Sequence, residues 1–366
     1  MDNLTLKLKR PHCLEAENCQ TESESSSVAK KTRDASSLAT GLDLASNFLQ
    51  TSLAESTVRQ YQASYRHWTD FCSENGLQEY PASVEHVSSC VAIVASKTRS
   101  VAIVESLASA IAYEHRKHFL PSPTMHETFR LLMRSIKKNF SGDRKTAEPI
   151  SRQLMDDLID YLFQESHGDN AALAPLSTWR TVWRVLMEYH TLARFSDVAP
   201  LRTSDLHFFE MPKLHLKVTF RGGKTDIFKE GSERVLSSNP DNLKYCPVRI
   251  TQLYLRFLGP DYSGTLLPRC LGGARQGRKH PDPARTLSRT TALEDFRDIL
   301  TKLGYNAALY SEHSGRRGGA TTAANLGMPA DDLQRLGGWR SRQTAAKYTE
   351  LNINKRLSMS DFLNKK

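Results

Sequence analysis

The sequence predicts a mainly α-helical protein of two domains, with one small β-hairpin sheet in the second domain. The chain of 366 residues is long enough for two domains of ordinary size and a tail. Apolar residues recur at helical spacing through 49–140 and through most of 150–366. Only residues 214–236 read as strands, grouped around a Gly222-Gly223 turn.

Residues 1–48 precede the first domain and are rich in Ser, Glu, Thr and Lys. They contain few apolar residues and show no periodicity, so they are predicted to be a disordered tail. Two small basic clusters, at 7–10 and 30–33, are candidate nuclear import signals. They favour a nuclear protein if the source is eukaryotic, and a protein of the cytoplasm or nucleoid otherwise.

The positive charge of the chain lies outside this tail. The formal net charge is +10, and residues 1–50 hold 6 Lys/Arg and 7 Asp/Glu, which leaves 44 against 33 for the rest. A basic folded body favours a polyanion such as nucleic acid, although a solvated surface gives the same composition. The sequence has neither an apolar run of about 18 residues nor a secretory signal, so no membrane association is expected. The six cysteines form no CxxC pair and are predicted to be free thiols.

The first domain, 49–140, is predicted to be all helical. Apolar periodicity places helices over 57–77, 85–95, 101–117 and 124–140. In the last of these, four basic residues lie at i, i+4, i+7 and i+8, away from the apolar side. Such a face is either solvated or in contact with phosphates. The candidate DNA contacts in the whole chain are Arg99, Arg116, Lys117, Arg130, Arg134, Lys137, Lys138, Arg289 and Arg317.

The polar stretch 141–149 contains Gly and Pro and indicates an exposed linker. Residues 150–366 then form a larger, mostly helical domain. Its last segment, 351–366, carries apolar residues scattered among polar ones, which can cap their own domain.

Two basic residues of this domain stand at predicted corners. Arg194 ends a helix that begins after Ser177, and Asp197 follows three positions later, where it can hold the guanidinium. Lys224 follows Arg221-Gly-Gly in the hairpin turn, where a flexible tip can reach a phosphate. Either pattern is also common in purely structural settings.

Four more candidates lie close together near the C-terminus. His313 and Arg316 are separated by three positions at the start of a helix near 316–326, so both can address one anion. Trp339 follows a Gly-Gly corner, and Tyr348 is expected in the last turn of a helix over 342–350 that Ser341 caps. Each could instead be a packing residue.

Taken in order, these residues resemble the pattern of the tyrosine recombinase (phage-integrase-like) family. That pattern is Arg with an acidic residue three positions on, a hairpin Lys, HxxR, then His or Trp, then Tyr. The gaps of 3, 23 and 9 residues that separate His313, Arg316, Trp339 and Tyr348 fit it. Residues 57–76 also resemble the start of the family's helical core-binding domain, so the likeness spans about 50–355.

The resemblance implies a two-domain clamp around double-stranded DNA and a tetramer acting on two DNA sites. It also implies that the segment 351–366 docks on a neighbouring protomer, with a cap on its own domain as the alternative. It implies that Tyr348 attacks a phosphodiester to give a 3′-phosphotyrosine, while Arg194 and Arg316 hold the non-bridging oxygens. Trp339 would donate a hydrogen bond to the same group. Lys224 and His313 would move protons, and Asp197 would orient the cluster. Neither a metal nor another cofactor is expected, because the covalent link conserves the bond energy.

Three alternatives remain open at this point. A domesticated recombinase would bind DNA without cutting it, and a type IB topoisomerase would use similar chemistry to relax supercoils. A purely structural helical protein is the third, and it leaves the spacing of the six residues unexplained.

Overall fold

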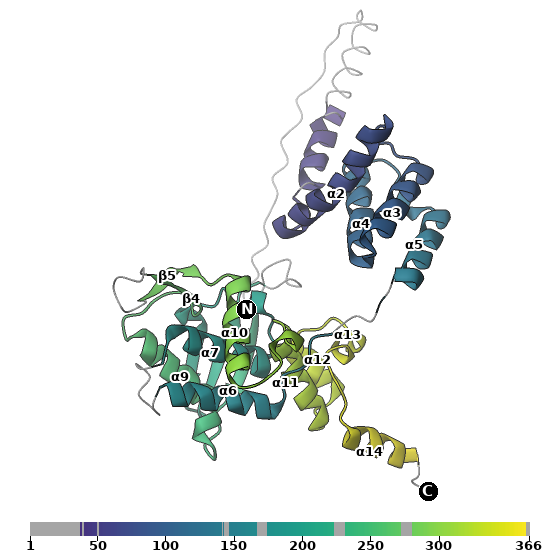
Figure 1. Cartoon of the computed structure of the whole chain (residues 1–366). Helices are drawn as coiled ribbons and strands as arrows, with labels where there is room; N and C mark the ends of the chain where they lie inside the picture. The colour runs from purple at the N-terminus through teal and green to yellow at the C-terminus, as the bar shows by residue number, and fades with distance from the viewer. Residues whose placement is uncertain are drawn as a thin grey trace, which may run out of the picture. The chain divides into compact units, whose positions relative to one another are not determined.

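The structure is a computed structural model that divides into two compact units, residues 1–144 and 145–366 (Figure 1). The boundary falls within the predicted linker. The described residues are 37–49 apart from 39, 51–140, 142, 146–166, 174–222, 231–271 and 280–363. Some sequence predictions concern residues outside these described ranges: the basic clusters at 7–10 and 30–33, Cys13, Cys19 and Lys224.

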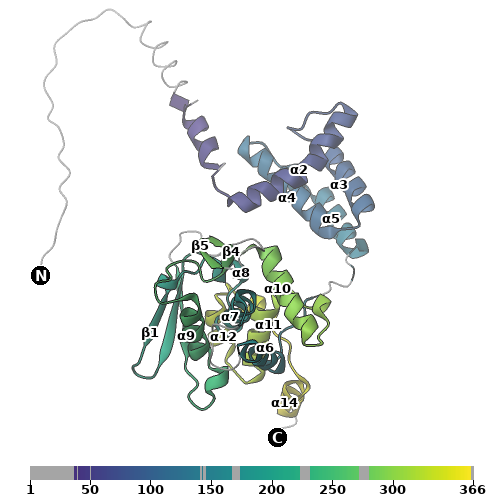
Figure 2. The ribbon, with the colours of Figure 1, turned by 60° about the vertical axis from the view of Figure 1, so that its left-hand side comes forward.

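The first unit is helical, as predicted (Figure 2). Its helices are α2 (Glu55–Asn75), α3 (Val84–Thr98), α4 (Val101–Lys117) and α5 (Glu127–Phe140), with a 3-10 turn, η1 (Pro123–Met125), before the last. The side chains of Ser83 and Ser100 accept hydrogen bonds from backbone N–H groups of the first turns of α3 and α4, which fixes where these helices begin. Trp68, Leu107 and Phe129 meet in the core that the helices share.

One part of the predicted tail is ordered. Residues 40–49 are helical, whereas the sequence predicted disorder up to residue 48. In this segment, the carbonyl oxygen of Leu49 accepts a hydrogen bond from the hydroxyl of Tyr113 at 3.3 Å. Leu42, Leu44 and Phe48 in this segment are exposed, so burial of an apolar face does not account for the helix.

The second unit surrounds one buried helix, α7 (Leu176–Thr191), on which almost every side chain is buried. The other helices are α6 (Arg152–Glu165), α8 (Phe195–Val198), α9 (Pro247–Leu258), α10 (Arg289–Lys302), α11 (Ser314–Asn325), α12 (Ala330–Gly337), α13 (Arg342–Ala346) and α14 (Ile353–Leu363). Helices α6, α9, α10 and α11 all contact α7, so the site residues at its C-terminal end rest on a rigid centre. No helix in the described ranges is long and apolar enough to cross a membrane.

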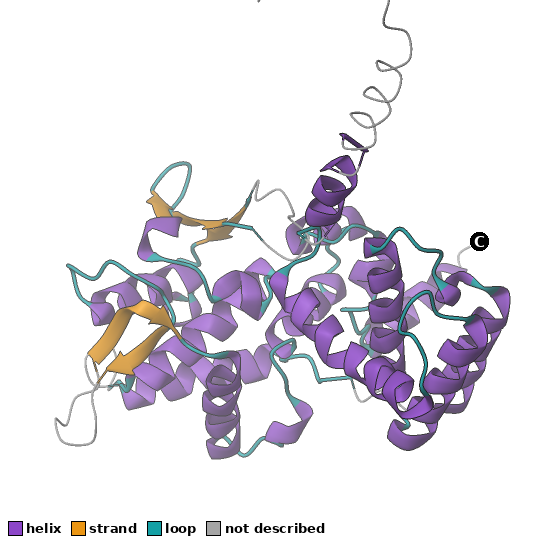
Figure 3. Ribbon diagram, turned by 90° about the horizontal axis from the view of Figure 1, so that it is seen from above, coloured by secondary structure: helices purple, strands orange, loops and turns teal. Residues whose placement is uncertain are grey.

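Two small antiparallel sheets lie beside the helices (Figure 3). The first has the order β1 (Leu206–Phe209), β2 (His215–Phe220) and β3 (Ser232–Ser237), with Val218 opposite Arg234. Its β2 and β3 match the predicted patch. The second sheet pairs β4 (Pro268–Leu271) with β5 (His280–Thr286) and was not predicted. Strand β5 contains two prolines, which are rare in strands, so its sequence did not predict a strand.

Helix α11 approaches α7 more closely than most side chains would allow. A Cβ added at Gly319 would lie 1.9 Å from the carbonyl oxygen of Tyr189, so only glycine fits there. The hydroxyl of Tyr189 also donates to Thr322 at 2.7 Å. This packing sets the start of α11, where His313 and Arg316 lie, against the C-terminal end of α7.

Candidate active site

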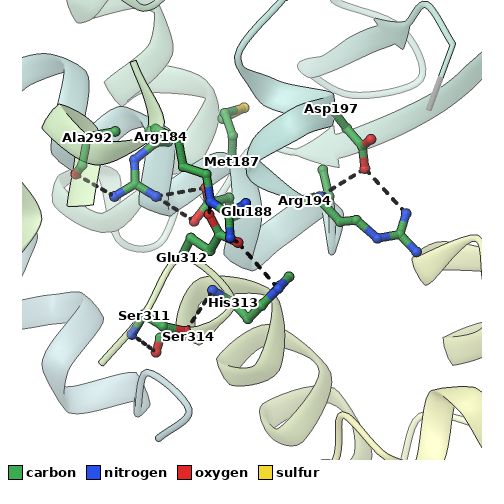
Figure 4. Close-up of polar contacts among 12 residues, drawn as sticks. Arg184, Met187, Glu188, Arg194, Asp197, Ala292, Ser311, Glu312, His313 and Ser314 are labelled. Atoms are coloured by element: carbon green, nitrogen blue, oxygen red, sulfur yellow. Dashed lines mark hydrogen bonds and ion pairs between the residues drawn. The ribbon is translucent and has the colours of Figure 1, made fainter. Parts of the chain in front are cut away.

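The C-terminal end of α7 turns sharply to present Arg194. Leu192 closes the helix in the left-handed region, at φ 53°, and Arg194 is the first residue of the next turn. The carboxylate of Asp197 accepts a hydrogen bond from the backbone N–H of Arg194 at 3.0 Å and lies 3.7 Å from its guanidinium (Figure 4). The predicted Arg194–Asp197 pair is thus formed.

Arg316 is the most enclosed member of the set, with 2% of its surface exposed. Its Nη1 donates to the carbonyl oxygen of Leu192, and its Nη2 donates to that of Gly337 at 2.7 Å. Its Nε has no hydrogen-bond partner among the described residues. Burial, together with the nearby Arg194, lowers the pKa of Arg316 to about 10, which still leaves it charged at neutral pH. A buried cation with an unused donor favours an anionic ligand.

Trp339 folds back over the glycine corner that precedes it. A Cβ at Gly337 would lie 2.0 Å from the indole, and Gly338 takes the left-handed conformation, at φ 60°. The indole is buried, and its Nε1, like Nε of Arg316, has no partner within the described ranges. The guanidinium carbon of Arg316 lies 4.5 Å from the centre of the Trp339 ring. Two neighbouring side chains therefore each carry an orphan donor.

Tyr348 is half-buried next to both groups. Its ring centre is 5.2 Å from that of Trp339 and 5.1 Å from the guanidinium carbon of Arg316. The sequence predicted a helix over 342–350 with Tyr348 in its last turn. Helix α13 instead ends at Ala346, so Tyr348 lies in the turn that follows it. The predicted cap is present, because the Ser341 hydroxyl accepts from the backbone N–H of Thr344.

Arg317 holds the turn that carries Tyr348. Its Nη1 donates to the carbonyl oxygen of Lys347 at 3.2 Å, and its Nη2 pairs with the carboxylate of Glu350. Its side chain is 9% exposed, and the DNA contact that the sequence suggested for Arg317 stays a prediction.

His313 precedes α11 and remains 47% exposed at its side chain. Its Nε2 lies 3.4 Å from the carboxylate of Glu312. Burial lowers the pKa of the imidazole, and Glu312 raises it. The arginines at 194, 289 and 316 lower it further, so the neutral imidazole is favoured near pH 7.

Arg234, on β3, belongs to the same cluster and was missed in the sequence. Its Nε donates to the carbonyl oxygen of Leu336 at 2.6 Å, which ties the sheet to the end of α12. Burial lowers the pKa of Arg234, whereas the charge of Asp197 raises it. Nothing in the local sequence separates this arginine from any surface strand residue, because its role depends on where the sheet docks.

The remaining predicted contacts divide by exposure. Arg99, Arg116, Arg130, Arg134 and Lys138 are exposed on the first unit. Lys117 pairs with Glu114 at 2.9 Å, and Lys137 pairs with Glu105 of α4 at 2.7 Å, an acidic partner that the sequence did not suggest. In the second unit, Arg289 begins α10, is 70% exposed and pairs with Glu312. Lys217, near Lys224 in the sequence, pairs with Glu233 across the sheet at 3.0 Å.

Comparisons with known proteins identify relatives of the chain. The model of the phage integrase family matches residues 153–355. Recombinase Cre of Escherichia phage P1 is 23% identical over 312 residues, which cover 81% of this chain and 84% of Cre. The structure of this chain is similar to that of a Tn1549 transposon integrase in complex with transposon right end DNA, with a TM-score of 0.51, 13% identity and coverage of 86% and 96% of the two chains.

A second structural relative is the XerH site-specific recombinase bound to difH substrate. The TM-score is 0.50 and the identity 12%, with coverage of 84% of this chain and 79% of XerH. At identities of 12% and 13%, structural similarity shows that the fold is shared and shows nothing more about function. The family match spans more than half of the chain and contains every candidate catalytic residue, so the chain belongs to the phage integrase family, the tyrosine recombinases, whose members cleave and rejoin DNA strands.

Proposed function

We propose that this protein performs site-specific recombination of double-stranded DNA through a 3′-phosphotyrosine intermediate formed on Tyr348. The observation that carries the proposal is the pair of orphan donors, Nε of Arg316 and Nε1 of Trp339, beside the Tyr348 ring. Buried donors are almost always satisfied in proteins, so this pair indicates an acceptor that arrives with the substrate. A phosphate oxygen meets that requirement and also suits the arginine.

The charge of the cluster supports the same substrate. Electrostatic interactions link three cations, Arg194, Arg234 and Arg316, with the carboxylate of Asp197. The sum of these four charges is +2. A phosphodiester gains negative charge on its non-bridging oxygens as a nucleophile adds. Cations fixed in place before the reaction stabilise this charge without having to reorganise.

The proposed step is a transesterification. The Oη of Tyr348 forms a bond to phosphorus while the bond from phosphorus to the 5′-oxygen breaks, and the tyrosine proton passes to His313. The departing 5′-oxygen takes up a proton, for which Lys224 is the proposed donor. Rejoining reverses these steps with a 5′-hydroxyl from the partner strand.

The proposed partners are DNA and further copies of the chain. Exposed arginines on the first unit, among them Arg130 and Arg134, would contact phosphates as the two domains clamp the duplex. Helix α14 exposes Ile353, Leu357 and Met359, which suits the proposed docking of 351–366 on a neighbouring protomer in a tetramer. The relatives captured on DNA support the first of these proposals.

A selection from random DNA tests the function even though the target sequence is unknown. The full chain is incubated with nicked duplexes of random sequence, protein-bound DNA is recovered under denaturing conditions, and the attached residue is mapped. We expect a covalent adduct on Tyr348 that Tyr348→Phe abolishes while DNA binding persists, with Tyr262→Phe as the matched control. No adduct would contradict the proposal, and relaxation of supercoils without joining of two sites would favour a topoisomerase.

A further inference from the structure

A carboxylate stands next to the proposed proton acceptor. Glu312 immediately precedes His313, its side chain is 11% exposed, and its Oε1 lies 3.4 Å from Nε2 of His313. Figure 4 shows the two side chains turned toward each other. The backbone N–H of His313 donates to the hydroxyl of Ser311 at 3.1 Å, which fixes the main chain at this position.

Glu312 is itself anchored from a distant part of the chain. Arg289, the first residue of α10, contacts both carboxylate oxygens through Nε and Nη2. Beneath the motif, Arg184 and Glu188 form a pair on α7, joined at 2.7 Å and 2.9 Å and almost wholly buried. A Cβ at Gly315 would lie 2.9 Å from Glu188, so this pair packs directly under the start of α11.

We propose that Glu312 is a positioning residue that fixes the orientation and tautomer of His313. In the proposed tautomer the proton is on Nε2, which faces the carboxylate at 3.4 Å, and the lone pair on Nδ1 is the proposed acceptor of the Tyr348 proton. The resulting imidazolium is stabilised by the adjacent negative charge. This inference rests on the proposed function, because it concerns the proton transfer that accompanies attack by Tyr348.

The electrostatic surroundings make this role specific. The charged groups that act on His313 are Glu312 beside it, Arg289 from α10, Arg316 from α11 and Arg194 from the corner before α8. The three arginines and burial all lower the pKa of the imidazole, and Glu312 alone among these groups raises it. Without Glu312, His313 would be a weaker base in a site that already disfavours its protonated form.

Removal of Arg289 should change the pKa of His313 in the direction opposite to removal of Glu312. This arginine neutralises Glu312 and also lowers the pKa of His313. Its removal should leave Glu312 free to act on the imidazole, which becomes more basic. Glu312→Gln and Arg289→Ala should therefore move the behaviour of His313 in opposite directions, which a loss of packing would not produce.

The test is the pH profile of single-turnover adduct formation at saturating DNA, with substrates recovered from the random-sequence selection. The rate should rise with pH as His313 loses its proton. Glu312→Gln should lower the plateau on the order of 10-fold, less than the ~10²-fold expected for loss of a general base, and should move the rising limb to lower pH. Glu312→Asp should restore part of the rate, and Arg289→Ala should move the limb to higher pH.

The control is Glu233→Gln, which removes a carboxylate paired with Lys217 far from His313 in the sequence. An unchanged profile in Glu312→Gln, with the wild type active, would overturn the inference and leave the proposed function intact. Absence of any adduct in the wild type would overturn the function instead. Titration of the His313 ring signals by NMR, assigned with His313→Gln, gives a readout without DNA, and an unchanged pKa in Glu312→Gln would also contradict the inference.

Discussion

Nη2 of Arg316 donates to the carbonyl oxygen of Gly337 at 2.7 Å and so joins the start of α11 to the corner that carries Trp339. The same guanidinium donates to Leu192, at the end of α7. One side chain thus sets the spacing between three segments that lie far apart in the sequence, and its remaining Nε is left for the substrate. Arg316 therefore has both a structural role and a proposed catalytic role.

Arg316→Lys should therefore lower the single-turnover rate of adduct formation. An ammonium cannot hold two carbonyl groups and a phosphate in one plane, and loss of one oxyanion donor elsewhere raises a barrier by about 3–4 kcal/mol. Arg285→Lys, at an exposed position on β5, is the matched control. A rate within a few-fold of the wild type for Arg316→Lys would contradict a role in the transition state.

Gly337→Ala should displace Trp339. The added methyl group would lie 2.0 Å from the indole, and overpacking of this kind costs about 1–3 kcal/mol of stability. We expect a lower thermal midpoint together with changed tryptophan fluorescence and slower adduct formation. Gly142→Ala, where an added Cβ meets nothing within 4 Å, should change none of these.

Arg317→Ala should slow cleavage without weakening DNA binding. The residue anchors Lys347 and Glu350 on either side of Tyr348, so its loss frees the turn that carries the nucleophile. The salt dependence of the dissociation constant should keep its slope, whereas Arg134→Ala, at an exposed site, should reduce that slope by about 1 if the face contacts a phosphate. A reduced slope for Arg317→Ala would mean that it contacts DNA after all.

The parts of the molecule that were predicted well are those set by local sequence. Helix α4 has the predicted bounds, 101–117, because an apolar periodicity and a serine cap coincide there. The candidate catalytic residues were predicted from the order and spacing that the sequence shares with a family pattern. Arg234 and Glu312 were not predicted, because their contacts form only when β3 meets α12 and α10 meets the residue before His313. The spacing of a motif does not encode such contacts between distant segments.

The buried pair beneath the site leads to a prediction about pH and stability. Burial raises the pKa of Glu188 to about 7, with Glu312 adding to the rise and Arg184 opposing it. The folded chain then holds this proton more tightly than the unfolded chain, whose ordinary value is 4.5. The contribution of Glu188 is therefore fully present below about pH 4.5 and is lost as the pH rises toward about 7.

The measurement is the free energy of unfolding in urea for the wild type and for Glu188→Gln, at several pH values between 4.5 and 7. Glutamine resembles the protonated carboxyl group in shape and does not titrate, so the variant is the pH-independent reference for Glu188. The difference between the two proteins should change with pH, since only the wild type releases a proton in this window. Relative to the variant, the wild type should lose stability as the pH rises, whereas Glu233→Gln should show no such trend. A difference that stays constant or grows with pH would mean that Arg184 outweighs burial and holds Glu188 ionised throughout.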